Sequence, residues 1–557
     1  MKKTTEMKRL FFAALLCGLG ASAGMACTNL IVTRGASADG SVMVTYAADS
    51  HQLYGELYYK PAADYPAGTM MQIHDWDTGK YLGEIPQVAH TYSVIGNMNE
   101  HQLVIGETTY GGREELMDTT GIIDYGSLIY ITLQRARTAR EAISVIDDLL
   151  QKYGYASEGE SFTIADPNEV WIMEMIGKST KLDRKGNNVN RGAVWVAKRI
   201  PDGSISAHAN QARITTIDFN DPENCLYSKD VVKFAREYGL FQGKDSEFSF
   251  CDVYAPLDFS GARACEARVW SFFNRFSKGM DKYLDYAMGY DLENHMPLYV
   301  TPDHKITNKE LADMMRDHYE GTPMDMTTDI GAGGSHLPYR WRPMGFEYEG
   351  KSYINERAIA TQQTGWWFVA QCRADKPFGI FWFGVDDAAT SPLTPYFSLS
   401  KRVHPAYEEG NGSLLEYSET SMYWLVSRIA QFSYLRYDKI GAEVRSVIDE
   451  WENSMMSAGL KSFDDLYARA SEENKVRSLT SMALATSAVL FDKWQSLDKR
   501  LLVKYIDGNI KKQNPDGSFM NNGFDERIPA SPIQEPYSDK WIENVVRDNG
   551  KVLQVPE

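Results

Sequence analysis

Cys27 is the residue whose surroundings point most directly to chemistry. A basic segment, the apolar stretch 10–19 and the small residues 20–26 precede it, which is the pattern of a secretory signal peptide. Cleavage after Ala26 would make Cys27 the N-terminal residue, whereas segment 21–23 offers a competing site. An N-terminal cysteine combines a thiol nucleophile with an α-amine of ordinary pKa about 7.7–8.0. That amine can take the thiol proton and return it to a leaving amine, so the two groups together can hydrolyse an amide bond.

A predicted hairpin brings an acid close to this cysteine. Residues 28–34 and 41–47 are expected to be strands, and Asp39-Gly40 between them is a turn signal. If the turn is centred near residue 38, Cys27 lies opposite residues 48–51. The Asp49 carboxylate could then hold the α-amine, although an isolated aspartate at a strand end is more ordinarily an exposed acid.

A second strand end carries a candidate amide donor. Asn210 follows the strand expected at 204–209. Its side-chain NH₂ could donate to a developing oxyanion, as acyl-transfer sites require. Asparagine in this position is also a common turn former, and the residue alone does not decide between the two roles.

Hairpins and helices alternate in a way that predicts an α+β fold. Repeated hairpins indicate antiparallel sheets rather than a doubly wound parallel sheet. Thr138 with Glu141 and Thr307 with Glu310 form capping boxes that predict helix starts, and the second helix should end by Gly321. From residue 417 onward helical periodicity dominates. Four further hairpins are expected, at residues 92–106, 162–175, 193–209 and 365–385.

The composition excludes several classes of protein. In 557 residues, 43% are hydrophobic and 12% aromatic, which requires a large core and excludes a disordered chain. The net charge of −17 and the lack of a basic run argue against nucleic-acid binding. After the leader no apolar run is long enough to span a bilayer, so no membrane anchor is expected. Motifs for metals, phosphate loops and serine hydrolases are missing, so we expect no metal or cofactor.

Six cysteines are present, and Cys17 would leave with the signal peptide. Besides Cys27, four remain that could form two disulfides in an oxidising compartment or stay free in the core. These four are Cys225, Cys251, Cys265 and Cys372.

An ordered set of motifs resembles the dipeptidase A family of cysteine peptidases. The family comprises N-terminal-nucleophile hydrolases related to penicillin V acylase and bile salt hydrolase. The resemblance runs from Cys27 to about Ser400. It is carried by Cys27-Thr28-Asn29-Leu30-Ile31-Val32, Ala38-Asp39-Gly40-Ser41, Asp49-Ser50, Asn99-Glu100, Ala207-His208-Ala209-Asn210, Glu266-Ala267-Arg268-Val269-Trp270, and the stretch 319–327.

The resemblance implies a fold and a set of site residues. The fold is an αββα sandwich, with two antiparallel sheets between helix layers. Cys27 is the implied nucleophile with Asp49 near its amine, and Asn210 belongs to the oxyanion hole. A backbone N–H between Glu107 and Thr109 would be the other donor. Arg268 is similar to an arginine close to the nucleophile in the acylase relatives, where it could lower the thiol pKa; a structural ion pair is the alternative.

One departure from the family pattern concerns the first hairpin. Relatives commonly carry an Arg-Asn pair shortly before the acid, whereas Tyr46-Ala47-Ala48 precedes Asp49 here. The substrate preference of those relatives therefore does not transfer directly, and the amine could be held differently.

These observations favour an exported dipeptidase, periplasmic or secreted. The organisation expected is a signal peptide at 1–26, a catalytic domain at 27–400 and a helical region at 401–557 packed on it. The substrates would be short peptides, cleaved through an acyl-enzyme on Cys27, with Glu107 or Asp49 meeting the substrate ammonium.

Two other hypotheses for the function stay open. An amidase of the same fold would act on an acyl amide, such as a conjugated bile acid or a lactam antibiotic. A lipid-anchored binding protein would carry its lipid on Cys27. Lipoprotein signals favour leucine three residues before the cysteine, however, and Gly24 stands there.

Overall fold

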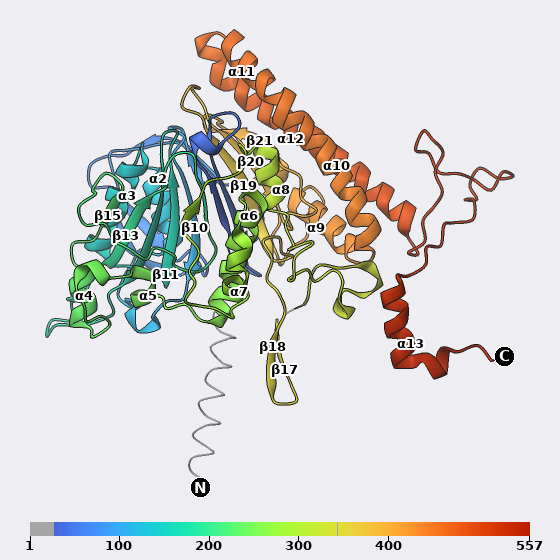
Figure 1. Ribbon diagram of the computed structural model, residues 1–557. Coiled ribbons are helices and arrows are strands. Elements are labelled where there is room, and N and C mark those ends of the chain that lie inside the picture. The colour runs from blue at the N-terminus through green and yellow to red at the C-terminus, as the bar shows by residue number, and fades with distance from the viewer. Residues whose placement is uncertain (1–26, 342–343, 557) are drawn as a thin grey trace, which may run out of the picture.

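Two large antiparallel sheets form the body of the protein (Figure 1). The computed structural model describes residues 27–341 and 344–556, so the predicted signal peptide lies outside the described residues. The first sheet has the order β16 (Tyr299–Val300), β14 (Ile205–His208), β1 (Asn29–Val32), β2 (Val42–Asp49), β19 (Thr364–Cys372), β20 (Ile380–Val385), β21 (Thr394–Phe397). The second has the order β15 (Cys225–Tyr227), β13 (Ala193–Arg199), β12 (Val170–Gly177), β11 (Gly159–Ala165), β10 (Val104–Tyr110), β9 (Met98–Asn99), β8 (Val94–Ile95), β3 (Tyr59–Lys60).

The hairpin that positions Cys27 is confirmed. β1 and β2 are antiparallel, with Val32 paired to Met43, and Thr28 forms an isolated bridge with Ala47. This register places Cys27 opposite Ala48, next to Asp49. The hairpins predicted at 162–175 and 365–385 are also confirmed, as β11 with β12 and β19 with β20.

The predicted hairpin at 193–209 is wrong. β13 belongs to the second sheet, where β12 and β15 pair with its two edges. No edge is left for β14, which lies in the first sheet between β1 and β16. The turn at 201–203 therefore carries the chain from one sheet to the other, and this crossing places Asn210 at the end of the strand beside β1.

The predicted hairpin at 92–106 is also wrong in its pairing. β8 and β9 form a tight hairpin of their own, with Gly96 at a φ of 52° in the turn. β9 meets β10 at Val104, while β10 pairs along its length with β11. Three smaller two-stranded sheets are β4 (Ala63–Asp64) with β7 (His90–Thr91), β5 (Met70–His74) with β6 (Tyr81–Pro86), and β17 (Gly345–Tyr348) with β18 (Lys351–Ile354).

Helices lie against both sheets. In α3 the Thr138 hydroxyl caps the helix as predicted, but the Glu141 carboxylate accepts from the Arg137 N–H, so that capping box is half formed. The box of Thr307 and Glu310 on α8 is complete, and α8 ends before Gly321 as predicted. The helices of this part are α2 (Tyr125–Leu133), α3 (Ala139–Tyr153), α4 (Val231–Glu237), α5 (Phe250–Tyr254), α6 (Ala267–Phe276), α7 (Leu284–Ala287) and α8 (Asn308–Met314).

The C-terminal region is helical, as predicted. Its helices are α9 (Met422–Ser433), α10 (Ala442–Asn453), α11 (Leu460–Arg469), α12 (Lys475–Tyr505) and the unpredicted α13 (Asp539–Leu553). α10, α11 and α12 form a projecting arm in Figure 1, whose base packs on the first sheet through α12 and β21. Short 3₁₀ and π segments are η1 (Arg34–Ala36), η2 (Glu114–Leu116), η3 (Asp245–Glu247), η4 (Gly261–Glu266), η5 (Met280–Tyr283), η6 (Ile330–Ser335), η7 (Pro405–Tyr407), η8 (Tyr437–Gly441), η9 (Ser454–Gly459) and η10 (Glu472–Asn474).

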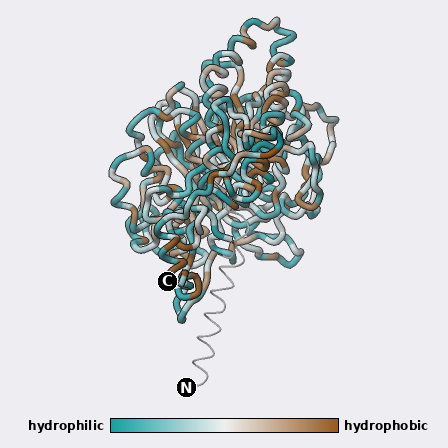
Figure 2. The backbone as a smooth tube through the Cα atoms, turned by 90° about the vertical axis from the view of Figure 1, so that its right-hand side faces the viewer, coloured by the Kyte–Doolittle hydropathy of each residue, from teal (hydrophilic) through white to brown (hydrophobic). Residues whose placement is uncertain are grey.

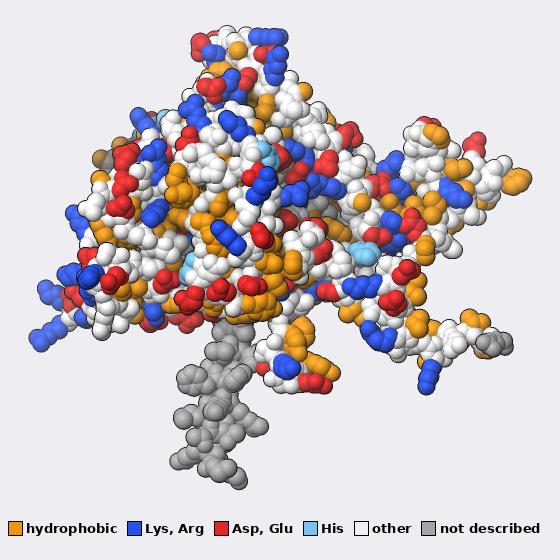
Figure 3. Space-filling model, in the orientation of Figure 1, with side chains coloured by type: hydrophobic (Ala, Val, Ile, Leu, Met, Phe, Trp, Pro, Cys, Tyr) orange, Lys and Arg blue, Asp and Glu red, His pale blue; other side chains and the backbone are white. Residues whose placement is uncertain are grey.

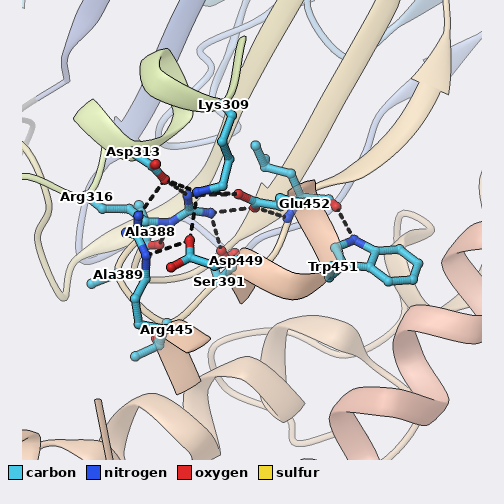
Figure 4. Close-up of polar contacts among 12 residues, drawn as sticks. Lys309, Asp313, Arg316, Ala388, Ala389, Ser391, Arg445, Asp449, Trp451 and Glu452 are labelled. Atoms are coloured by element: carbon cyan, nitrogen blue, oxygen red, sulfur yellow. Dashed lines mark hydrogen bonds and ion pairs between the residues drawn. The ribbon is translucent and has the colours of Figure 1, made fainter. Parts of the chain in front are cut away.

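A buried ion pair fixes α10 to the body (Figure 4). The Arg316 guanidinium donates to both carboxylate oxygens of Glu452, at 3.0 and 2.6 Å. Glu452 also accepts from the backbone N–H of Leu393, just before β21. Lys309 of α8 pairs with Asp449 at 2.7 Å. Removing one partner of a buried pair typically costs about 3–5 kcal/mol because the other charge is left unpaired, so substitution of Arg316 or Glu452 alone should destabilise the protein.

The two sheets are joined by a buried histidine. His208 on β14 forms hydrogen bonds of 2.7 Å with Thr108 of β10 and with Thr163 of β11. Burial lowers the pKa of His208 to about 3, so the ring is neutral and its role here is structural.

Apolar segments gather inside the body in Figure 2, whereas exposed apolar side chains mark the β17–β18 hairpin and the C-terminal segment seen in Figure 3. Among the described residues, no helix is both long and apolar enough to cross a membrane. All five cysteines of the described chain are free thiols, so the two disulfides considered from the sequence are not formed.

Candidate active site

The Cys27 thiol is fully buried among polar side chains. Its Sγ donates to Glu107 Oε1 at 3.3 Å and lies 3.6 Å from the Tyr46 hydroxyl. Burial, followed by the charges of Glu107 and Asp49, raises the pKa of the Cys27 thiol well above its usual value. The thiol is therefore protonated at neutral pH and needs a base. In the full-length chain the Cys27 nitrogen is an amide joined to Ala26, so the α-amine base exists only after cleavage.

Asp49 lies beside Cys27, and an arginine reaches it from far along the chain. Its Oδ2 accepts from Arg357 Nη2 at 2.6 Å, and its Oδ1 accepts from the Thr364 hydroxyl at 2.6 Å. Burial raises the pKa of Asp49, and Arg357 opposes this rise. The family's arginine before the acid is replaced in the sequence by Tyr46-Ala47-Ala48, yet a guanidinium still contacts this carboxylate.

Asn210 is held in position by its neighbours on both sides. Its φ of 59° is left-handed, a conformation that asparagine tolerates better than most residues. Its Nδ2 donates to the Thr109 carbonyl at 2.7 Å, and its Oδ1 accepts from Arg268 Nη2 at 3.0 Å. The amide is thus fixed with its NH₂ group at the edge of β10.

Arg268 connects Asn210 to the backbone of Cys27. The guanidinium Nη1 donates to the Cys27 carbonyl at 2.7 Å and to the Thr28 hydroxyl at 2.8 Å. Nη2 also donates to the Ala209 carbonyl at 3.1 Å. These contacts hold the backbone at Cys27 against the strand end at Asn210, which makes Arg268 a positioning residue.

The open edge of β10 faces this group of residues. The Glu107 carbonyl accepts from Asn29 Nδ2 at 2.6 Å, and the Thr109 carbonyl accepts from Asn210. In a β-strand the N–H and C=O of one residue point to the same side, so the Thr109 N–H lies on this edge too. Gly106 permits the approach, because a Cβ there would come within 2.2 Å of Asn29 Oδ1.

Sequence reasoning missed three side chains of the site. Arg357 follows the β17–β18 hairpin, where no local pattern marks it. In the sequence Tyr46 stands out only because the family's Arg-Asn pair is missing there, although its hydroxyl donates to Glu107. Glu160 lies on β11 beside Glu107 and falls just before the strand start predicted at residue 162; a glutamate alternating with buried residues was the available signal. Within residues 27–341 and 344–556, no cluster of three or more His, Cys, Asp or Glu side chains could hold a metal ion.

The geometry places a buried cysteine where a signal peptide would end, with a fixed amide donor nearby. A family model described as peptidase family C69 matches residues 26–450, well over half of the chain. The chain belongs to peptidase family C69. The resemblance drawn from the motifs is confirmed at this level. The match begins next to Cys27 and extends past Ser400 into α10, so this family's pattern includes part of the helical region.

Relatives within this group carry a more specific name. A probable dipeptidase of Salmonella dublin is 26% identical over 373 residues, covering 62% of this chain and 77% of the relative. A probable dipeptidase of Latilactobacillus sakei is 23% identical and covers 79% and 88%. A probable dipeptidase B of Streptococcus pyogenes serotype M1 is 22% identical and covers 89% and 94%.

Proposed function

We propose that this C69 peptidase is an exported dipeptidase whose nucleophile is Cys27 at a processed N-terminus. The observation that carries the proposal is the Cys27 thiol 3.3 Å from the buried Glu107 carboxyl, directly after a signal-like segment. The names of the relatives support the substrate class. The leader at 1–26 supports export to the periplasm or the medium.

The architecture supports this class of chemistry. α3 contacts β11, β12 and β13 of the second sheet, while α6 contacts β14, and α8 contacts β2 and β19, of the first. This arrangement supports the αββα sandwich of N-terminal-nucleophile hydrolases. The boundary between a catalytic domain at 27–400 and a helical region stays a prediction.

The mechanism follows from the groups around the thiol. The α-amine of processed Cys27 takes the Sγ proton, and Sγ attacks the substrate carbonyl carbon. The oxyanion that develops receives hydrogen bonds from Asn210 Nδ2 and the Thr109 N–H. The ammonium of Cys27 returns the proton to the leaving amine, and water then hydrolyses the thioester by the same base. Asp49 is the acid proposed to orient the amine.

A dipeptide brings its own positive charge close to this thiol. From standard bond lengths, the substrate ammonium nitrogen lies roughly 2.5 Å from the scissile carbon. A carboxylate beside Sγ is therefore within ion-pair reach of that nitrogen. Glu107 meets this requirement, whereas the Asp49 carboxylate is already paired with Arg357.

A comparison of blocked and free peptides tests this function. We expect the processed enzyme to hydrolyse unblocked dipeptides, and N-acetylation to lower kcat/KM by roughly 10²-fold or more. The reason is that acetylation removes the ammonium and leaves the buried Glu107 charge without its partner. The panel consists of free dipeptides, their N-acetyl forms, a glycine-conjugated bile acid and penicillin V, each with and without a chelator.

The same panel separates the alternatives. Faster turnover of the acylated compounds would contradict the dipeptidase and assign an amidase with the same nucleophile. A diacylglyceryl group on Cys27, with no hydrolysis of any compound, would assign a lipid-anchored binding protein.

A further inference from the structure

Two buried carboxyl groups meet beside the nucleophile without a cation. Glu107 Oε1 accepts from Cys27 and Tyr46, and Glu160 Oε2 accepts from the Thr109 hydroxyl at 3.0 Å. The second oxygens, Glu107 Oε2 and Glu160 Oε1, are both buried without a hydrogen-bond donor. Both side chains are fully inaccessible to solvent. An oxygen left in this state costs free energy, so these two atoms call for an explanation.

Strand register makes the two side chains neighbours. Thr109 pairs with Glu160, and Glu107 pairs with Phe162, so Glu107 and Glu160 are diagonal neighbours on one face of the sheet. This is the face that packs against α2 and α3, where Ile105 contributes to the apolar core. Two carboxylates this close in an apolar setting cannot both be ionised at neutral pH.

The groups around the pair add negative rather than positive charge. Asp77, from the turn between β5 and β6, acts on both carboxyls and accepts from Tyr125 of α2 at 2.8 Å. The other titratable groups that act on the pair are Cys27, Tyr46 of β2, Tyr110 of β10, Tyr125 and Tyr130 of α2, and Tyr155. Within the described part of the chain, Glu107, Glu160 and Asp77 form no ion pair with lysine, arginine or histidine.

The environments of the two carboxyl groups differ, and the difference indicates which of them is protonated. Burial and then the charge of Glu107 raise the pKa of Glu160 well above its usual value. For Glu107 burial also raises the pKa, but the hydrogen bonds from Tyr46 and Cys27 oppose the rise, whereas the donor to Glu160 is the Thr109 hydroxyl. Glu160 is therefore the acid and Glu107 the carboxylate.

We propose that Glu160 keeps its proton at neutral pH and donates it from Oε1 to Glu107 Oε2. The pair then carries one negative charge, which matches the single ammonium of a dipeptide. Glu160 is a positioning residue, because it holds Glu107 with Oε1 directed at Cys27 and never meets the substrate itself. This inference rests on the proposed function for the role of Glu107, but the proton between the two acids does not.

Two substitutions of Glu160 test the hydrogen bond through catalysis. In Glu160→Gln the amide oxygen can accept from Thr109 and the amide N–H can donate to Glu107, so kcat/KM for free dipeptides should stay within about threefold. In Glu160→Ala the Glu107 oxygen loses its donor, and KM should rise about 10–100-fold with a smaller change in kcat. Glu158→Gln makes the same chemical change two residues earlier, outside the pair, and should leave both constants unchanged.

A spectroscopic measurement tests the proton without any substrate. Buried Glu174 and Asp386 also have pKa values raised to about 7, so the readout is the infrared difference spectrum between wild type and Glu160→Gln at pH 7. One protonated-carboxyl carbonyl band should be lost in Glu160→Gln, and the same band should be lost when the substitution is made in Cys27→Ala. Near-ultraviolet circular dichroism checks that each variant is folded. A difference spectrum without this band, or a folded Glu160→Gln as impaired as Glu160→Ala, would overturn the proposal. A band that is present in an enzyme inactive on dipeptides would instead reject the proposed function and keep the acid pair.

Discussion

Replacing Cys27 with alanine should lower kcat by at least about 10⁴-fold, which is the scale on which removing a covalent nucleophile acts. The effect is large because the two groups that contact the thiol, the Glu107 carboxyl and the Tyr46 hydroxyl, are hydrogen-bonded to each other and are poor replacements for a thiol nucleophile. Activity is measured with the best free dipeptide of the panel, using enzyme processed to residue 27.

The fold should survive this change, since alanine is smaller and the position loses one weak sulfur hydrogen bond. Thermal unfolding and near-ultraviolet circular dichroism check this. Cys225→Ala is the matched control, because it removes another free thiol, on the edge strand β15 of the second sheet, and it should retain activity. If folded Cys27→Ala keeps more than a few per cent of wild-type activity, Cys27 is not the nucleophile.

Substitution of Asn210 by alanine should lower kcat by roughly 10²–10³-fold with a small change in KM, the usual effect of losing one oxyanion donor. The loss falls on kcat because the oxyanion exists only in the transition state and in the tetrahedral intermediate. Single-turnover kinetics with a free dipeptide measures the acylation step directly.

The backbone conformation of Asn210 calls for a second variant. Alanine is strained at a φ of 59°, whereas glycine is not, so Asn210→Gly removes the amide without adding strain. Both variants should lose kcat to a similar extent if the amide is the oxyanion donor. A glycine variant as active as the wild type would show that the effect of alanine comes from backbone strain. Asn210 would then not be an oxyanion donor.

The part of the site next to Cys27 was predictable because it depends on short-range order. A turn signal at Asp39-Gly40 and alternating strands fix the register of β1 and β2, and register alone places Asp49 beside Cys27. The same reasoning gave the hairpins β11–β12 and β19–β20. In each case the partner strand is the next one in the chain, and no other strand competes for that edge.

The pairing of strands that are far apart in the chain could not be predicted from local sequence patterns. Alternation and turn chemistry predicted strands at both 193–200 and 204–209, but they do not say which edge a strand finds, and β14 joined the other sheet. Arg357 contacts Asp49 across a separation that no periodicity spans. Glu160 lies beside Glu107 because β10 pairs along its length with β11 and meets β9 only at Val104. The hairpin predicted at 92–106 did not include this pairing.

The central claim is that a free α-amine on Cys27 and its own thiol form the catalyst. The most direct test is the intact mass and N-terminal sequence of the active, purified enzyme. The account predicts a single species that begins at Cys27 with an unmodified amine and loses activity in step with alkylation of Cys27, as located by peptide mass mapping. Active enzyme that begins at Gly24, or that carries an acyl group on the Cys27 amine, would contradict it.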